Sequence, residues 1–400
     1  MVPTSRQPGP AFALALASIS LVGPLAIHIY LPVIPAVKAD LGLSDALAQA
    51  TFALGLAAMA FSTRFWGAMS DRYGRRPILL SGLVIFLLGS LACALAQGVV
   101  TLILGRLLQA FGAGVGGALA RTIARDAYGP DKLVRAIAYL TMFYTLGPMI
   151  SPIAGGLLID HISWRAVFGF SLLAGAGILA AVYFIIWETR PRAQTGVIPK
   201  GFIGDSISLF SNMRFTCFVL QTGFNTGAFF VAASSASFLM KETLNRPASE
   251  FGYWFVLFPM GFFLGNFVSS RVGGRASNET MVLLGAIIGA LSIGLFCSLL
   301  MAGFITPLTI FAPGFLITFA QGISLPYGQA GAMATFPRIA GTAAGIGVFT
   351  QNIVGAIFAQ LYGFFADGTV WPIVLVTGLS AILGLLVSLP PYLTRRRRAV

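Results

Sequence analysis

The sequence has 400 residues, of which 57% are hydrophobic and only 9% are charged, and its mean hydropathy is +0.88. An ordinary soluble domain carries roughly a quarter charged residues, so this chain could not cover its surface in water and needs lipid around most of it. Its net charge of +13 is spread in short runs between apolar stretches, which argues against a nucleic-acid-binding protein.

Twelve apolar stretches are long enough to cross a membrane, which takes about 20 residues. The first six are predicted at roughly 11–34, 46–69, 78–97, 101–123, 136–158 and 166–187, and the last six at roughly 214–239, 251–270, 280–301, 307–327, 340–364 and 371–391. We therefore expect an all-α membrane protein with a first six-helix bundle in residues 1–187, a polar cytoplasmic linker in 188–211, and a second bundle in 212–400 that ends in a basic tail.

The basic residues predict the orientation of these spans. If the N-terminus is cytoplasmic, the inside segments hold 19 of the 25 Lys and Arg residues, whereas the outside loops hold only Lys38, Arg165, Lys241 and Arg246. This asymmetry follows the positive-inside rule with both termini in the cytoplasm. The sequence therefore predicts a multi-pass protein of a bacterial inner membrane.

Short repeats relate the two halves. Three residues at the end of span 5 recur at the end of span 11 with a constant offset of 207, as Gly156, Asp160 and Trp164 recur as Gly363, Asp367 and Trp371. The segment Ser70–Arg76 matches Ser269–Arg275 at four of seven positions. Parallel six-span halves are typical of transporters, in which the substrate site lies between the halves near the membrane midplane.

A charged loop between spans 2 and 3 reads Gly67-Ala-Met-Ser-Asp71-Arg72-Tyr-Gly74-Arg75-Arg76. Gly67 permits close helix packing, Gly74 permits a tight turn, and Asp71 can pair with arginines or with a helix N-terminus. We interpret the loop as a conformational latch, because a simple positive-inside anchor accounts for the arginines but not for Asp71 and the glycines. The loop resembles the G-x-x-x-D-R-x-G-R-R motif of the major facilitator superfamily.

Spans 4 and 5 carry two further motifs of that superfamily. Span 4 holds Arg106 and Gln109, which resemble its intramembrane-arginine motif, and a charge at membrane depth is a functional candidate by default. The alternative for Arg106 is snorkelling to the nearby outer surface. Span 5 resembles the antiporter motif of drug exporters, with Gly147, Pro148, Pro152, Gly155 and Gly156. The alternative is a structural kink that says nothing about export.

Three shorter matches narrow the resemblance to one branch. They are Tyr30-Leu31-Pro32-Val-Ile-Pro35, the Arg125-Asp126 pair, and Trp164-Arg165-Ala-Val-Phe168. Together they resemble the Bcr/CflA-like (bicyclomycin/chloramphenicol resistance) drug:proton antiporters over nearly the whole chain, more closely in the first half. This resemblance implies efflux of varied drugs by a monomer that uses the proton gradient and no cofactor.

One departure from that family concerns proton coupling. Relatives place an aspartate two residues before the Tyr-Leu-Pro of span 1, where this chain has His28, and all 12 acidic residues fall in loops or at span ends. Histidine can titrate near neutral pH, with an unperturbed pKa of about 6.5. We predict a proton-coupling and substrate cavity formed by His28, Tyr30, Arg106, Gln109, Gln221 and Asn225. A His28 that is merely packed and hydrogen-bonded is the alternative.

The predicted cavity is electropositive, which favours neutral, zwitterionic or anionic substrates over cationic drugs. A second function stays open, in which the same fold carries one metabolite such as an amino acid, sugar or organic anion, by export or uptake. An enzyme is not expected, because two histidines and three dispersed cysteines, Cys93, Cys217 and Cys297, assemble no catalytic or metal cluster.

Overall fold

The computed structural model describes residues 8–190, 209–336 and 339–399, and every regular element in these residues is a helix. The first half contains α1 (Pro10–Ile19), α2 (Val22–Ile27), η1 (His28–Tyr30), α3 (Val33–Leu41), α4 (Asp45–Tyr73), α5 (Arg75–Ala94), α6 (Val99–His161) and α7 (Trp164–Ile185). The second half contains α9 (Met213–Phe238), η2 (Leu239–Thr243), α10 (Ala248–Phe255), α11 (Leu257–Val272), η3 (Gly273–Arg275), α12 (Asn278–Met301), α13 (Pro307–Thr335), α14 (Ala340–Phe365) and α15 (Trp371–Ala399).

The predicted all-α membrane fold with twelve spans is confirmed. Within the described residues, 12 helical segments are long and apolar enough to cross a membrane, from Pro10–Tyr30 to Trp371–Thr394. Large apolar side chains point outward on both halves, with Leu173 74%, Phe184 82% and Leu291 71% exposed. Exposed apolar surface of this extent is stable only where lipid covers it.

Spans 4 and 5 differ from the prediction, because the segment expected to be a loop between them is helical. Element α6 contains 63 consecutive helical residues from Val99 to His161 and includes both spans, Val99–Tyr128 and Tyr139–His161. A straight helix of that length would measure about 95 Å, three times the hydrocarbon core. The chain instead reverses within α6, since Arg165, just after its end, donates to the carbonyl of Ala96, just before its start, at 3.0 Å.

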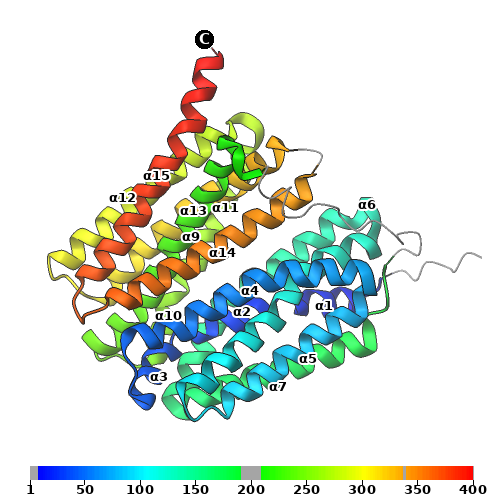
Figure 1. The fold of residues 1–400 in the computed structure, drawn as a ribbon, viewed down its shortest axis with the longest axis horizontal. Coiled ribbons are helices and arrows are strands. Elements are labelled where there is room, and N and C mark those ends of the chain that lie inside the picture. The colour runs from blue at the N-terminus through cyan, green and yellow to red at the C-terminus, as the bar shows by residue number, and fades with distance from the viewer. Residues whose placement is uncertain (1–7, 191–208, 337–338, 400) are drawn as a thin grey trace, which may run out of the picture.

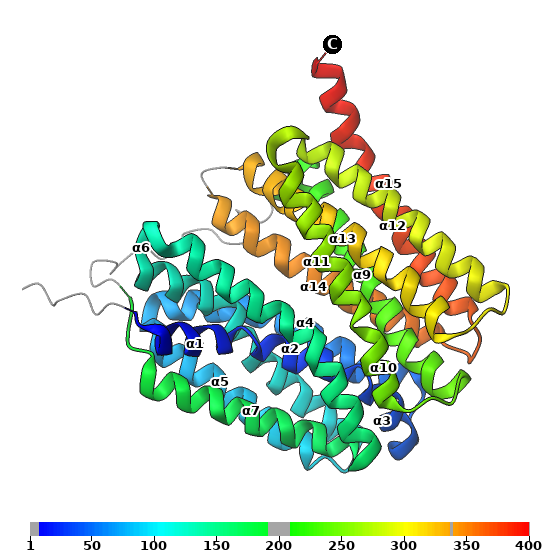
Figure 2. The same cartoon turned by 180° about the vertical axis from the view of Figure 1, so that it is seen from behind.

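The two halves form separate bundles that diverge from one end (Figures 1 and 2). At the end where α3, η2 and α10 lie, here called the joined end, Lys38 binds Glu242 at 2.8 Å and Gln49 donates to Ser234 at 2.9 Å. At the opposite end, here called the splayed end, lie the turns that join α4 to α5 and α11 to α12. Most of the predicted linker 188–211 falls outside the described residues.

Candidate functional site

The first span is interrupted next to His28. Helix α2 ends at Ile27, and one turn of 3-10 helix, η1, follows before α3 begins at Val33. Pro32 has no N–H, so the carbonyl of His28 lacks its usual partner four residues later and accepts from the Leu31 N–H at 3.3 Å. The prolines of the Tyr-Leu-Pro motif therefore place the interruption at His28.

Arg106 of α6 is fully buried and holds this interruption in place. Its guanidinium donates to the carbonyl of Ala26 at 2.7 Å and to Gln109 Oε1 at 2.6 Å, and it lies 4.1 Å from the centre of the Tyr30 ring. These groups are dipoles and a π-face, and among the described residues no carboxylate is paired with Arg106, so its positive charge stays inside the bundle. None of its surface is exposed, which excludes the snorkelling alternative.

The partners of Arg106 are themselves held by hydrogen bonds. Tyr30 Oη lies 2.6 Å from Thr51 Oγ1, and Gln109 Nε2 donates to Ser90 Oγ at 2.9 Å. Tyr30 and Gln109 are as fully buried as Arg106. None of these side chains can touch a solute in this conformation, so they act here by fixing the shape of spans 1 and 4.

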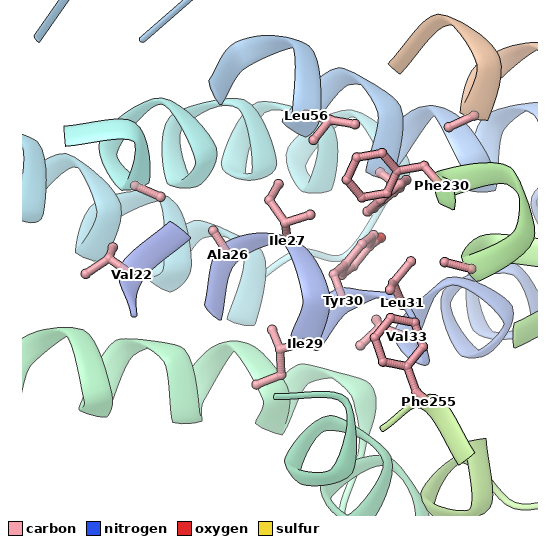
Figure 3. Close-up of a cluster of buried hydrophobic side chains, with 14 of the residues drawn as sticks. Val22, Ala26, Ile27, Ile29, Tyr30, Leu31, Val33, Leu56, Phe230 and Phe255 are labelled. Carbon is pink, nitrogen blue, oxygen red and sulfur yellow. The ribbon is translucent and has the colours of Figure 1, made fainter. Parts of the chain in front are cut away.

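His28 differs from these residues because it is only half-buried and meets the second half of the molecule. Its ring centroid lies 6.4 Å from that of Phe229 and 6.5 Å from those of Phe230 and Phe255. Its Nδ1 atom is buried and has no hydrogen-bond partner in the described part of the chain. Figure 3 shows Phe230 and Phe255 reaching toward Tyr30, Leu31 and Val33 of the first span. An imidazole thus stands at the contact between the halves.

The two predicted residues of span 7 have different surroundings. Asn225 donates to Ser324 of α13 at 2.9 Å and is half-buried. Gln221 is fully buried, and within the described residues neither atom of its side-chain amide has a hydrogen-bond partner. The structure therefore places Asn225 in a link between α9 and α13, and Gln221 out of reach of a solute.

The charged loop at the splayed end is organised around Arg75. This side chain is 2% exposed and donates to Asp71, to Asp126 at 3.0 Å and to Ser70 at 2.8 Å. Both acceptor carboxylates belong to the first half. Around it, Arg76 donates to the carbonyl of Tyr183 at 2.7 Å, and the carbonyl of Arg72 accepts from Arg190 at 2.7 Å.

Gly74 allows a glutamate to cap the next helix. Its φ of +105° is a conformation that side chains disfavour, and a Cβ there would lie 2.6 Å from Glu188 Oε2. Glu188 accepts from the first two N–H groups of α5, at Arg75 (2.9 Å) and Arg76 (3.1 Å). Gly67 differs, since a Cβ there would meet nothing within 4 Å. Its expected role in helix packing is therefore absent in this conformation.

The glycines of span 5 face the interrupted first span and the second half. A Cβ at Gly147 would lie 2.3 Å from Pro24, and one at Gly155 would lie 2.6 Å from the carbonyl of Ile29. The segment that contains Pro148 and Pro152 remains helical to His161. These glycines therefore bring α6 against spans on both sides, as small residues do in membrane bundles.

Polar contacts at the joined end were not predicted from the sequence. Ser237 of α9 donates at 2.8 Å to the carbonyl of Leu31, whose usual partner is missing because residue 35 is proline. Lys38 binds Asp45 at 2.6 Å as well as Glu242. Burial alone would lower the pKa of Lys38, but hydrogen bonds to Asp45 and Glu242 outweigh it and raise that pKa. In the sequence, Pro35 indicates only that the Leu31 carbonyl lacks its helical partner. The partners from the second half, Ser237 and Glu242, lie 206 and 204 residues away from Leu31 and Lys38.

Comparison with known proteins identifies the family. Residues 16–359 match the model of the Major Facilitator Superfamily. The chain belongs to this superfamily. It is 31% identical to multidrug resistance protein D of Escherichia coli K12, over 96% of each chain. It is 27% identical to a bicyclomycin resistance protein homolog of Haemophilus influenzae, over 94% of each chain. The predicted Bcr/CflA-like membership is thus confirmed.

A solved structure supports the fold alone. A D-xylose-proton symporter superposes with a TM-score of 0.78 at 14% identity, covering 95% of this chain and 97% of that one. Its membership of the superfamily, shown by the family match and the relatives above, makes the protein a transporter and not an enzyme.

Proposed function

We propose that this transporter exports drugs or similar small molecules from the bacterial cytoplasm across the inner membrane, driven by the proton gradient. The similarity to multidrug resistance protein D, over 96% of each chain, supports drugs as the substrate class. The glycine-rich span 5, packed against the interrupted first span, supports antiport. Transport proceeds in a monomer, with the two halves tilting about the site between them.

The distribution of basic residues supports a cytoplasmic location for both termini. The splayed end carries the Arg72, Arg75 and Arg76 loop, and positive residues accumulate on the cytoplasmic side. In this orientation the described conformation has its joined end outside and its splayed end inside. In this form a transporter of the fold exchanges its substrate with the cytoplasm, as the first step of export requires.

His28 is the proposed proton-coupling group. It occupies the position where the family has an aspartate, its Nδ1 is unpartnered, and it stands where the halves meet. Arg106 fixes the backbone two residues earlier through the carbonyl of Ala26. A proton on His28 would add a second positive charge to that of Arg106. Protonation of His28 and binding of an anionic or neutral substrate therefore affect each other through the same local electric field.

The preferred charge of the substrate follows from the surroundings of Arg106, which is fully buried and hydrogen-bonded to neutral dipoles. In low dielectric this charge repels cations at membrane depth. The transporter therefore prefers neutral, zwitterionic or anionic substrates. Tyr30 and Gln109 shape the site by holding Arg106, while Gln221 and Asn225 belong to the opposite wall and come into play when the halves move.

The test is export from proteoliposomes with an imposed pH gradient, comparing wild type with His28→Ala and His28→Asp. We expect His28→Ala to lose gradient-driven export, and His28→Asp to regain it with cations now accepted, because a carboxylate restores the family's negative charge. His161→Ala is the matched control, since His161 is the other histidine and lies exposed at the end of α6.

Two results would contradict the proposal. Normal gradient-driven export by His28→Ala would place the proton elsewhere. Strong export of a lipophilic cation by wild type would exclude the electropositive site. If wild type moves a single metabolite and no drug, with or without a gradient, the alternative of a metabolite carrier is correct.

A further inference from the structure

Helices α6 and α10 cross at the joined end through small residues on both sides. A Cβ at Gly156 would lie 2.3 Å from the carbonyl of Ala248, and a Cβ at Gly252 would lie 2.6 Å from the carbonyl of Pro152. Each helix thus presents two facing positions four residues apart, which lets backbones from different halves touch. Separation of the halves at this end requires this contact to open.

Asp160 lies one helical turn beyond Gly156, on the same face of α6. Its two carboxylate oxygens accept from the backbone N–H groups of Ala248 at 2.9 Å and of Ser249 at 2.8 Å. These are the first amides of α10, which have no partner within their own helix. The residue before them is Pro247, which offers no side-chain cap. Asp160 therefore caps a helix that belongs to the other half.

We propose that Asp160 is the outer clamp of the transport cycle: its carboxylate holds the joined end closed by capping α10, and must leave α10 each time that end opens. The negative charge also faces the positive end of the α10 helix dipole. Asp160 lines a small cavity between the halves together with the basic residues Lys241 and Arg246.

The internal repeat offers a matched control for this clamp. Asp367 stands at the repeat position of Asp160, and Gly363 at that of Gly156. Gly363 also meets the other half, since a Cβ there would lie 2.3 Å from Gln49. Asp367, however, bonds the backbone and hydroxyl of Thr369, two residues away. The sequence explains the difference, because α4 is capped by its own Ser44 and begins with Asp45, which would repel a second carboxylate.

The clamp can be tested without a drug or a pH gradient, and so independently of the proposed function. Hydrogen–deuterium exchange is followed by mass spectrometry on the full chain in nanodiscs, for wild type, Asp160→Ala, Asp160→Asn and Asp367→Ala. In Asp160→Ala we expect the first amides of α10, and with them α3 and the end of α9, to exchange about fivefold faster or more. Asp160→Asn keeps one acceptor oxygen, so exchange at these amides should be faster than in wild type and slower than in Asp160→Ala.

The controls separate a clamp from general loosening. Exchange in the first turns of α5 and α12, which begin at the splayed end, is expected to stay at the wild-type rate in every variant. Asp367→Ala is expected to change only the segment around Thr369. Unchanged exchange at α10 in both Asp160 variants, or an equal increase there in Asp367→Ala, would overturn the proposal. If Asp160→Ala fails to fold, Asp160→Asn carries the comparison.

Discussion

The two halves share one helix arrangement but differ in the polarity that they bury. The first half encloses a charge, since Arg106 is held by Ala26 and Gln109 without an exposed atom. Deeper in its bundle the second half encloses neutral amides and hydroxyls, with Gln321 donating to Thr226 at 3.1 Å and Asn225 to Ser324 at 2.9 Å. Its buried Glu279 lies in the first turn of α12 and is paired with Arg214.

This difference assigns different tasks to the halves. A buried charge is costly in a membrane, so it is expected only at a functional position. The hydrogen bonds of Arg106 keep its guanidinium in one place. Neutral amides exchange partners at low cost, because their hydrogen bonds in membranes contribute only about 0.6 kcal/mol on average. In the proposed mechanism, the first half would provide fixed electrostatics for coupling, and the second would provide polar groups that rearrange around substrates.

Removal of the buried charge of Arg106 is expected to have the largest effect on stability and export. Arg106→Met leaves the Ala26 carbonyl and Gln109 Oε1 without this donor, at about 1–3 kcal/mol each, so we expect a loss of about 3 kcal/mol and of all export. Gln321→Leu, the control in the second half, is expected to lose about 0.6 kcal/mol. Thermal unfolding in detergent and proteoliposome export measure both.

Arg106→Lys refines this prediction. Lysine keeps the charge but not the fork of donors that spans Ala26 and Gln109, so stability should return in part and export should not. A thermal midpoint for Arg106→Met equal to that of Gln321→Leu would show that the buried charge does not organise the first half.

The loops that join α4 to α5 and α11 to α12 give a second, smaller contrast. Gly74 and Gly273 are repeat positions with φ of +105° and +53°, but only Gly74 has a neighbour, Glu188, within 4 Å of a built Cβ. Gly74→Ala therefore adds a clash to backbone strain and should lose about 2–3 kcal/mol, whereas Gly273→Ala should lose about 1 kcal/mol. Chemical unfolding in mixed micelles compares the two, and equal losses would mean that Glu188 does not cap α5.

The sequence predicted the features that depend on local composition. Twelve spans followed from apolar length, and the family followed from motifs within single loops or helices, such as Gly67–Arg76. The tight turn at Gly74 could also be predicted, because a motif glycine signals positive φ. These features require no knowledge of which helices touch.

The features that the sequence did not predict join distant residues. Ser237 lies 206 residues from Leu31, and Asp160 lies 88 and 89 residues from the amides that it caps. The direction of the Arg106 side chain was also open, since burial and snorkelling both start from the same helix position. It is decided by the interruption at His28, which exposes the Ala26 carbonyl to α6.

The smallest contrast concerns acid stability at the joined end. Hydrogen bonds from the Trp164 indole, and then from Arg165, lower the pKa of Asp40 and tie α3 to α7. A carboxyl whose pKa is lower in the folded state stabilises the fold fully above its unfolded pKa of about 3.9, and this contribution is lost as the pH falls through the folded pKa. Asp367 is held by Thr369, whose hydroxyl and amide lower its pKa from two residues away.

Because the Thr369 contact is local, it persists in part on unfolding, whereas the Asp40 contacts join residues 124 and 125 positions apart and do not. Asp40→Asn should therefore lower the thermal midpoint at pH 7 by about 1 °C and leave the acid limb below pH 4 shallower, since exposed pairs are screened by water. Asp367→Asn should leave both nearly unchanged. Thermal midpoints measured between pH 3 and pH 7 test this prediction. Parallel curves of midpoint against pH for wild type and Asp40→Asn would show that α3 is held to α7 by packing of Trp164 alone.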